Sequence, residues 1–215
     1  MVRVRSALLL QMIGALLYLA VPASAQTMAK SGERLSSFMR IHGSAQPPYG
    51  FVRFCEASPD QCLTAASTDA RFNATPERLS ELDEVNRVVN RIIEPLTDME
   101  IYGVSEYWTL PVDRGDCEDY ALLKRKVLIE RGWPASSLLM TVVRDEKGEG
   151  HAVLTARTAQ GDFILDNKIT DVRVWYRTPY DFVMRQSYLN PRAWVSLDPG
   201  NSSTPAALAG VRQQR

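Results

Sequence analysis

Three residues of this 215-residue chain, Cys117, His151 and Asp166, have the types and the spacing of a thiol-dependent catalytic group. Cys117 stands at the expected start of a helix, where unpaired backbone N–H groups and the positive end of the helix dipole favour a thiolate. His151 opens one expected strand, and Asp166 ends the next. If these strands form a hairpin that turns near residues 159–161, the imidazole and the carboxylate meet. Asp166 can then orient His151, whose other ring nitrogen faces the thiol as a base.

Acidic residues surround the candidate nucleophile, because Asp116 precedes Cys117 and both Glu118 and Asp119 follow it. Carboxylates beside a thiol raise its pKa and oppose the effect of the helix dipole. One interpretation is a capping box, with Asp116 as the cap and Asp119 at the third helical position. The other is a site for a hard cation such as Ca²⁺, which would cancel these charges and fix the start of the helix. The spacing is compatible with both interpretations.

The remaining cysteines, Cys55 and Cys62, are predicted to form a disulfide. Six residues separate them in a segment rich in proline and glycine, where the chain must turn and a local bridge is feasible. This spacing is wider than the about two to four residues of zinc knuckles, which disfavours a zinc site. The pairing leaves Cys117 unpaired. A lone cysteine is ordinarily an inert apolar side chain, so its place at a helix start is what favours catalysis.

Two helices are predicted before the histidine. The first covers residues 75–93, because a threonine and a proline open it and apolar residues recur every three or four positions. The second begins at residue 116 or 117 and ends near residue 131, before Gly132 and Pro134. Residues 97–115 are expected to form a connecting loop.

Short strands are predicted after the second helix, separated by glycine-containing turns. Helices followed by a meandering set of strands predict an α+β domain with an antiparallel sheet. The expected strands cover residues 138–143, 152–157, 163–165 and 172–175.

Residues 1–25 have the three parts of a secretory signal peptide: early arginines, an apolar run at 7–21, and small residues before Gln26. The apolar run is shorter than the about 20 residues that span a bilayer, although an uncleaved membrane anchor is the alternative. We divide the rest into an N-terminal extension at 26–74, a catalytic domain at 75–198 and a flexible tail at 199–215.

The charge balance argues against nucleic acid as a partner. Of 25 basic residues, two arginines leave with the signal peptide, so 23 remain against 25 acidic residues. Scattered charges with a net value near −2 form no basic footprint. No second apolar run approaches membrane length, so the mature protein is not expected to be embedded in a membrane.

The motifs around the three candidate residues resemble the bacterial transglutaminase-like cysteine proteinases, a family that includes periplasmic proteases of the LapG type. The similarity covers roughly residues 75–195. It is carried by Tyr107-Trp-Thr-Leu-Pro, Gly115-Asp-Cys-Glu-Asp-Tyr-Ala-Leu-Leu-Lys124, Gly150-His-Ala-Val-Leu154 and Phe163-Ile-Leu-Asp-Asn167. The resemblance implies a papain/transglutaminase-like α+β fold, with the nucleophile helix packed on an antiparallel sheet and a Cys-His-Asp triad.

The resemblance also implies Ca²⁺, bound through the acids that flank the nucleophile, here Asp116 and Glu118. Asp119, Asp98 and Asp113 are candidates for the remaining ligands. Family members of this type cut a large cell-surface adhesin and are sequestered by an inner-membrane receptor. The resemblance therefore implies a periplasmic location, an adhesin substrate and such a receptor as partner.

The sequence thus predicts an exported cysteine protease in which Cys117 attacks the peptide carbonyl, His151 carries the proton and Asp166 orients His151. Trp108 is expected either to line the cleft or to pack in the core. One alternative is a transglutaminase or other acyl transferase with the same triad. The other is a non-catalytic, calcium-stabilised periplasmic binding module.

Overall fold

The computed structural model describes residues 36–63 and 71–200. The predicted signal peptide and nearly all of the predicted tail lie outside these residues. No helix within the described ranges is long and apolar enough to cross a membrane.

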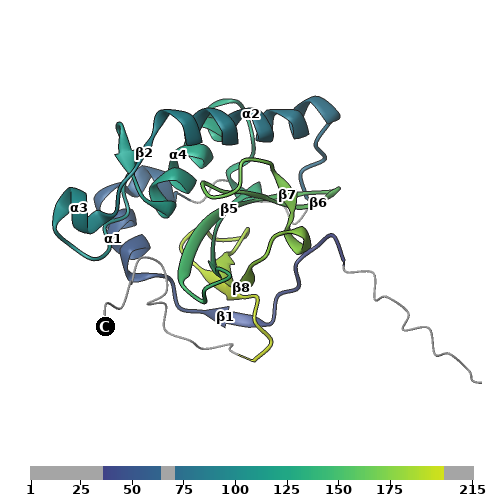
Figure 1. Ribbon diagram of the computed structural model, residues 1–215. Helices are drawn as coiled ribbons and strands as arrows, with labels where there is room; N and C mark the ends of the chain where they lie inside the picture. Colours follow the sequence, from purple (N-terminus) through teal and green to yellow (C-terminus); the bar gives the residue numbers. More distant parts are fainter. Residues whose placement is uncertain (1–35, 64–70, 201–215) are drawn as a thin grey trace, which may run out of the picture. The chain divides into compact units, whose positions relative to one another are not determined.

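The described residues fold around an antiparallel sheet of seven strands (Figure 1). Its strand order is β1-β9-β8-β4-β5-β6-β7. The two longest strands, β4 and β5, lie in its middle and carry the hairpin that holds His151. The strands are β1 (Gly43–Ala45), β4 (Leu138–Arg144), β5 (Gly150–Thr158), β6 (Gly161–Leu165), β7 (Arg173–Val174), β8 (Asp181–Gln186) and β9 (Trp194–Ser196). The predicted α+β class and antiparallel sheet are therefore confirmed.

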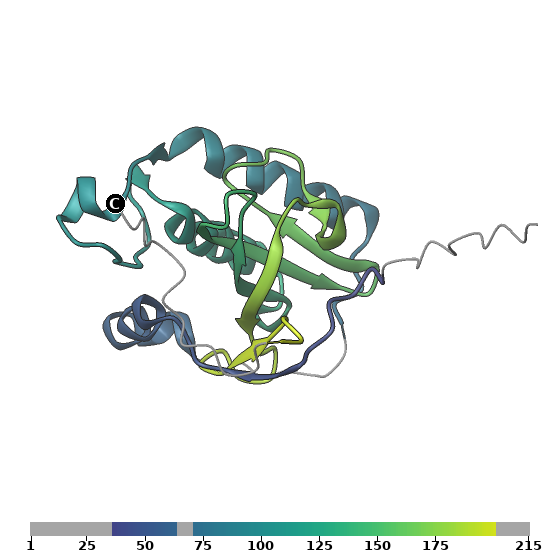
Figure 2. The same cartoon turned by 60° about the horizontal axis from the view of Figure 1, so that its bottom comes forward.

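Two long helices pack on one side of this sheet, and both views place them over β5 and β6 (Figures 1 and 2). Helix α2 (Pro76–Ile92) begins where Thr75 accepts the Arg78 N–H, as its sequence predicts. Helix α4 (Cys117–Glu130) packs on β4 and β5, and α2 contacts both α4 and β6. After α4, Gly132 adopts a positive φ of 88°, which ends the helix at the predicted place.

Both faces of the central strands are buried, so each strand carries two sets of core residues. Leu154 and Ala156 of β5 join the large core under the helices. Val153, which points to the opposite face, packs with a smaller cluster that includes Ile164 and Tyr180. His151 has the same parity as Val153, so it lies on the face away from the helices.

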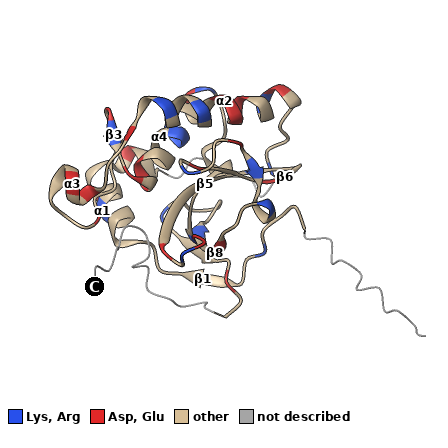
Figure 3. Ribbon diagram, in the orientation of Figure 1, with Lys and Arg blue, Asp and Glu red and all other residues tan. Residues whose placement is uncertain are grey.

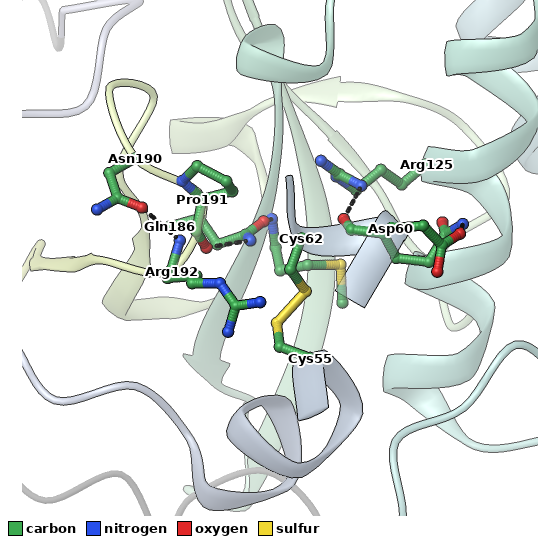
Figure 4. Close-up of a disulfide and its surroundings, with 10 residues drawn as sticks. Cys55, Asp60, Cys62, Arg125, Gln186, Asn190, Pro191 and Arg192 are labelled. Atoms are coloured by element: carbon green, nitrogen blue, oxygen red, sulfur yellow. Dashed lines mark hydrogen bonds between the residues drawn. A yellow bond between two sulfur atoms is a disulfide. The ribbon is translucent and has the colours of Figure 1, made fainter. Parts of the chain in front are cut away.

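The segment before residue 75 contributes to the same sheet and core. Strand β1 pairs with β9, and helix α1 (Tyr49–Ala57) buries Phe51 against Trp194 with ring centroids 5.3 Å apart. The 3-10 helix η1 (Pro59–Cys62) follows, and the predicted Cys55–Cys62 disulfide ties it to α1 (Figure 4).

The structure differs from the sequence prediction in several connections. Residues 97–115, expected to be a loop, contain helix α3 (Asp98–Tyr102) and end in the short strand β3 (Arg114–Gly115), which pairs in parallel with β2 (Glu94–Pro95). The strand expected at 172–175 is limited to β7, because the 3-10 helix η3 (Trp175–Arg177) follows it directly. A further 3-10 helix, η2 (Ala135–Ser137), leads into β4.

Candidate active site

Cys117 is the first residue of α4, as the sequence predicts. Asp116 precedes it in an extended conformation, with φ −108° and ψ −161°, and its carbonyl accepts the Tyr120 N–H at 3.1 Å. The Asp116 side chain caps no N–H of α4 among the described residues, so the structure does not show the capping box that the spacing allowed.

The thiol of Cys117 lies against strand β5. The Ala152 N–H donates to Sγ at 3.3 Å, and the thiol donates to Oε2 of Glu118 at 3.1 Å. Because Ala152 directly follows His151, the first contact brings the sulfur to the backbone next to the imidazole. The start of a helix and the start of a strand therefore meet at the candidate nucleophile.

His151 and Asp166 also come together, through the β5–β6 hairpin that the sequence predicts. Leu154 pairs with Leu165, the last residue of β6, so Asp166 directly follows the hairpin register and comes close to the start of β5, where His151 lies. Nε2 of His151 lies 2.8 Å from Oδ1 of Asp166. The two side chains are 1% and 2% exposed, so this hydrogen bond is shielded from water.

Further groups that sequence reasoning missed hold the carboxylate of Asp166. The Tyr180 hydroxyl donates to Oδ2 at 2.5 Å, and the Lys168 N–H donates to Oδ1 at 3.0 Å. The Tyr180 ring also packs edge-on against the His151 imidazole, with centroids 5.5 Å apart. Tyr180 precedes β8, a strand absent from the sequence prediction, and only the tertiary fold brings it here.

Helix α2 fixes the backbone of Asp166 from the other side. Oδ1 of Asn86 accepts the Asp166 N–H at 3.0 Å, and Nδ2 of Asn90 donates to the Asp166 carbonyl at 2.8 Å. The two asparagines are four residues apart, so they share a face of the helix. Polar residues on that otherwise apolar face are the signal by which the sequence could have revealed them.

The pKa values of Asp166 and Cys117 shift in opposite directions. Burial alone would raise the pKa of Asp166, but the hydrogen bond and charge of His151, with the Tyr180 hydroxyl and the Lys168 N–H, hold it below its ordinary value. Burial, followed by the charges of Glu118 and Asp116, raises the pKa of Cys117 well above its ordinary value. Burial, together with these carboxylates, thus outweighs the helix dipole that favours a thiolate at this position.

Four acids gather around the start of α4, where Figure 3 shows acidic segments on α3 and α4. Asp98, Asp116 and Asp119 each offer an oxygen within 4.8 Å of the others, and Asp116 forms a second such group with Cys117 and Glu118. We call these four acids the acid cluster. Each has one buried oxygen that meets no hydrogen-bond donor in the described part of the chain: Oδ1 of Asp98, Oδ1 of Asp116, Oε1 of Glu118 and Oδ2 of Asp119.

Buried carboxylate oxygens without donors are costly unless a cation or a proton neutralises them. Burial, with the charge of Asp116, raises the pKa of Asp98 to about 7. Burial also raises the pKa of Asp119 to about 8, against the lowering effect of a hydrogen bond from the Thr109 N–H. Hard oxygen ligands of this kind and number suit Ca²⁺, so the residues present fit the cation that the resemblance implies.

Local structure explains how Asp98, eighteen residues before Asp116, reaches the acid cluster. Thr97 and Glu100 form a reciprocal capping box that starts α3 at Asp98. At the other end of the segment, Leu96 N–H donates to the Gly115 carbonyl at 3.1 Å, which closes the segment onto the base of α4. Gly115 is required there, because a Cβ at this position would lie 2.6 Å from Oδ2 of Asp119.

Two other residues singled out by the sequence lie outside this arrangement. The exposed carboxylate of Asp113 pairs with Arg114 at 3.1 Å and is not part of the acid cluster. Trp108 is a core residue, 3% exposed, that packs edge-on against Phe51 with centroids 5.7 Å apart. Of the two alternatives for Trp108, the structure shows core packing.

A helix that presents a cysteine to an antiparallel sheet carrying a histidine–aspartate pair defines the class of transglutaminase-like cysteine hydrolases. The family described as bacterial transglutaminase-like cysteine proteinase BTLCP matches residues 41–202, and the chain belongs to this family. The protein is therefore a cysteine peptidase by family, which confirms the resemblance read from the motifs and the predicted class of enzyme.

Solved structures of LapG from Legionella pneumophila are similar to this chain. One is 28% identical with a TM-score of 0.44, and covers 53% of this chain and 65% of that one. An EGTA-treated form is also 28% identical with a TM-score of 0.44, over 53% and 64%. A calcium-bound form is 25% identical with a TM-score of 0.47, over 64% and 76%. The first two matches thus span less than two thirds of the LapG chain, and no relative was found among curated proteins.

Proposed function

We propose that the protein is an exported protease in which Cys117, His151 and Asp166 form the catalytic triad. The observation that carries this proposal is the meeting of three elements: the Cys117 sulfur accepts the Ala152 N–H, and the adjacent His151 is bonded to Asp166. Because Nε2 of His151 is engaged by the carboxylate, Nδ1 is the nitrogen left to exchange a proton with the thiol.

The reaction runs through an acyl-enzyme. The Cys117 proton passes to Nδ1 of His151 as the sulfur attacks the scissile carbonyl carbon, and Asp166 stabilises the imidazolium that forms. The Cys117 N–H at the start of α4 donates to the developing oxyanion. The C–N bond then breaks as His151 gives its proton to the leaving amine. Water, deprotonated by His151, attacks the thioester and releases the new carboxylate and the thiol.

Ca²⁺ is the cation we assign to the acid cluster, with Asp116 and Glu118 as ligands and Asp98 and Asp119 completing the set. Support comes from their four buried oxygens that lack donors within the described ranges. A bound cation supplies positive charge that offsets the carboxylates around the thiol, which removes their upward effect on its pKa. It would also join α3 to the start of α4.

The substrate we propose is a large cell-surface adhesin, cut in the periplasm, with an inner-membrane receptor as the regulatory partner. Family membership supports this assignment, because it is what the motif resemblance implies for proteases of this type. The test is to incubate the mature chain with the N-terminal region of a repeat adhesin from the same genome and to sequence the new peptide termini.

The triad is tested with matched variants. Cys117→Ser and His151→Ala should each lower the rate of cleavage by at least about 10³-fold, because each removes a group that acts in the transition state. His42→Ala is the control for the histidine, since His42 is the other histidine of the chain and is exposed. Equal cleavage rates for His151→Ala and His42→Ala would refute the proposed triad.

The same assay separates the alternatives. New peptide termini support hydrolysis, whereas ammonia release with cross-linked products would identify an acyl transferase with the same triad. A binding module predicts no chemistry at all: Cys117 would react with iodoacetamide no faster than free cysteine at neutral pH in excess Ca²⁺, and Cys117→Ser would leave every cellular phenotype intact.

A further inference from the structure

An ion pair joins the turn before His151 to the loop after Asp166. Nζ of Lys168 donates to Oδ2 of Asp145 at 2.9 Å. Asp145 directly follows β4 and opens the turn of residues 145–149, which leads into β5. Lys168 lies two residues after Asp166, in the loop between β6 and β7. Neither charged side chain belongs to the proposed triad or to the acid cluster.

The ladder between β5 and β6 does not itself hold His151 against Asp166. Its last pair is Leu154 with Leu165. His151 lies three residues before Leu154 on β5, and Asp166 follows the end of β6. On its other side, His151 pairs with Val143 of β4. The open end of the β5–β6 hairpin is therefore closed by side chains, and their contacts set the separation of the imidazole and the carboxylate.

Asp145 organises the turn from within. Its Oδ1 accepts the N–H groups of Lys147 and Glu149, each at 2.9 Å. Its own N–H donates to the Glu149 carbonyl, also at 2.9 Å. The Asp145 side chain is 5% exposed, whereas that of Lys168 is 44% exposed. Removing the ammonium would therefore leave a mostly buried carboxylate with backbone donors on one oxygen only.

Lys168 connects Asp166 to this turn through two separate groups. Its backbone N–H donates to Oδ1 of Asp166 at 3.0 Å, and the same oxygen lies 2.8 Å from Nε2 of His151. Its ammonium reaches the turn that leads into β5. The contacts run from Asp166 through Lys168 to Asp145, whose turn leads back to the histidine. A second route thus links the histidine and the aspartate, in addition to their own hydrogen bond.

We propose that the ion pair of Asp145 and Lys168 positions the triad, because it fixes the turn before His151 against the loop that follows the triad carboxylate. We call this ion pair the clasp, and its two members are positioning residues. The effect on catalysis rests on the proposed function, whereas the coupling of the turn to the loop does not. The two can therefore fail separately.

The first test removes each charge and keeps the backbone contacts. Lys168→Met retains the N–H that holds Asp166, and Asp145→Asn retains an oxygen that can accept the two N–H groups of the turn. Each variant should lower kcat about threefold to tenfold with KM within about twofold, because the reacting groups move while no substrate contact is lost. Lys168→Arg should restore most of the rate, since a guanidinium can pair with the same carboxylate. Lys147→Met, which changes an exposed lysine of the same turn, is the matched control and should leave kcat unchanged.

The two variants also form a double-mutant cycle. Asp145→Asn combined with Lys168→Met should lose no more kcat than the worse of the two single variants, because each substitution alone already opens the clasp. Losses that add would show that the two residues act independently and would overturn the proposal. Equal kcat values for Lys168→Met and Lys147→Met would overturn it as well.

Amide hydrogen exchange tests the coupling without any cleavage. In Asp145→Asn, the Lys168 N–H should exchange at least about threefold faster than in the wild type, because the loop is released from the turn. The Asp166 N–H is the internal control: it donates to Asn86 of α2, so its exchange should be unchanged. Equal acceleration at both amides would indicate a general loss of stability, and unchanged exchange at Lys168 would show that turn and loop are not coupled. Either result would overturn the proposal. A wild-type chain that cleaves no peptide would instead refute the proposed function, and the exchange rates would still decide the coupling.

Discussion

Removing the Ca²⁺ that we propose for the acid cluster should destabilise the protein by an amount that grows as the pH rises. The perturbation is chelation with EGTA, and the groups concerned are the carboxylates of the acid cluster. In the metal-free protein, burial and the charge of Asp116 raise the pKa of Asp98 to about 7, and burial raises that of Asp119 to about 8, from ordinary values of 3.8.

The direction follows from proton binding. A folded-state pKa above the unfolded value means that the folded chain holds a proton that the unfolded chain has lost. The stabilisation is complete below about pH 4 and is lost as the pH rises through 7 for Asp98 and through 8 for Asp119. Below about pH 5, therefore, the carboxyl groups of the metal-free cluster are largely protonated, and their burial costs little stability. At about pH 8, Asp98 is largely ionised and Asp119 is about half ionised, so like charges are buried together.

The magnitude can be bounded. Each pH unit over which the folded state alone holds a proton costs about 1.4 kcal/mol of unfolding free energy per group. From about pH 5 to about pH 8, the two groups together give an upper limit of about 7 kcal/mol. Coupling between the carboxylates and relaxation around them reduce this to on the order of 3 kcal/mol. Bound Ca²⁺ keeps the ligands ionised at every pH in this range, so the same dependence should be absent in excess Ca²⁺.

Urea unfolding followed by tryptophan fluorescence, at about pH 5, 6.5 and 8 in excess Ca²⁺ or EGTA, measures the effect. Asp98→Asn should shrink both the pH dependence in EGTA and the stabilisation by Ca²⁺. Asp113→Asn, which changes an exposed acid outside the cluster, should alter neither. The reasoning is refuted if EGTA lowers the unfolding free energy equally at both ends of the range, or if the two variants behave alike.

Three further predictions concern the supports of the site. Replacing both Cys55 and Cys62 with alanine should cost about 2.5 kcal/mol in urea unfolding, from the loop entropy of a seven-residue separation; a loss below about 0.5 kcal/mol would contradict this. Gly115→Ala should cost about 1–3 kcal/mol and weaken Ca²⁺ binding measured by calorimetry, because its Cβ would lie 2.6 Å from Oδ2 of Asp119; an unchanged affinity would show that the carboxylate moves freely. Thr97→Ala removes the capping box of α3 and should lower the unfolding free energy by about 1 kcal/mol, whereas no change would mean that α3 contributes nothing to stability.

The parts of the fold that local patterns encode were predictable. The start of α4 was predicted to within a residue, at Asp116 or Cys117, and its end was predicted from Gly132 and Pro134. The β5–β6 hairpin was predicted from alternating residues around a glycine turn, and the disulfide from the count and spacing of the cysteines. These features depend on residues close together in the chain.

The parts of the fold that the sequence analysis missed depend on residues distant in the chain or on short local signals. Helix α3 carries the capping-box signature Thr97-x-x-Glu100, which marks a helix start even in so short an element. Strand β8 ends in the buried polar pair Arg185 and Gln186, which hides its alternation. Tyr180 was invisible as a partner of Asp166, because only the tertiary fold brings them together.

The pairing of β1 with β9 has a consequence for any shortened form of the protein. A chain that began at residue 75 would lack the partner of Trp194–Ser196, so one row of backbone N–H and C=O groups would become an open edge. The same cut would remove Phe51 from the face of Trp194 and uncover an indole that is now 2% exposed. An open edge beside a bare apolar surface is a template for self-association, so such a fragment should aggregate even with every residue of the proposed triad intact.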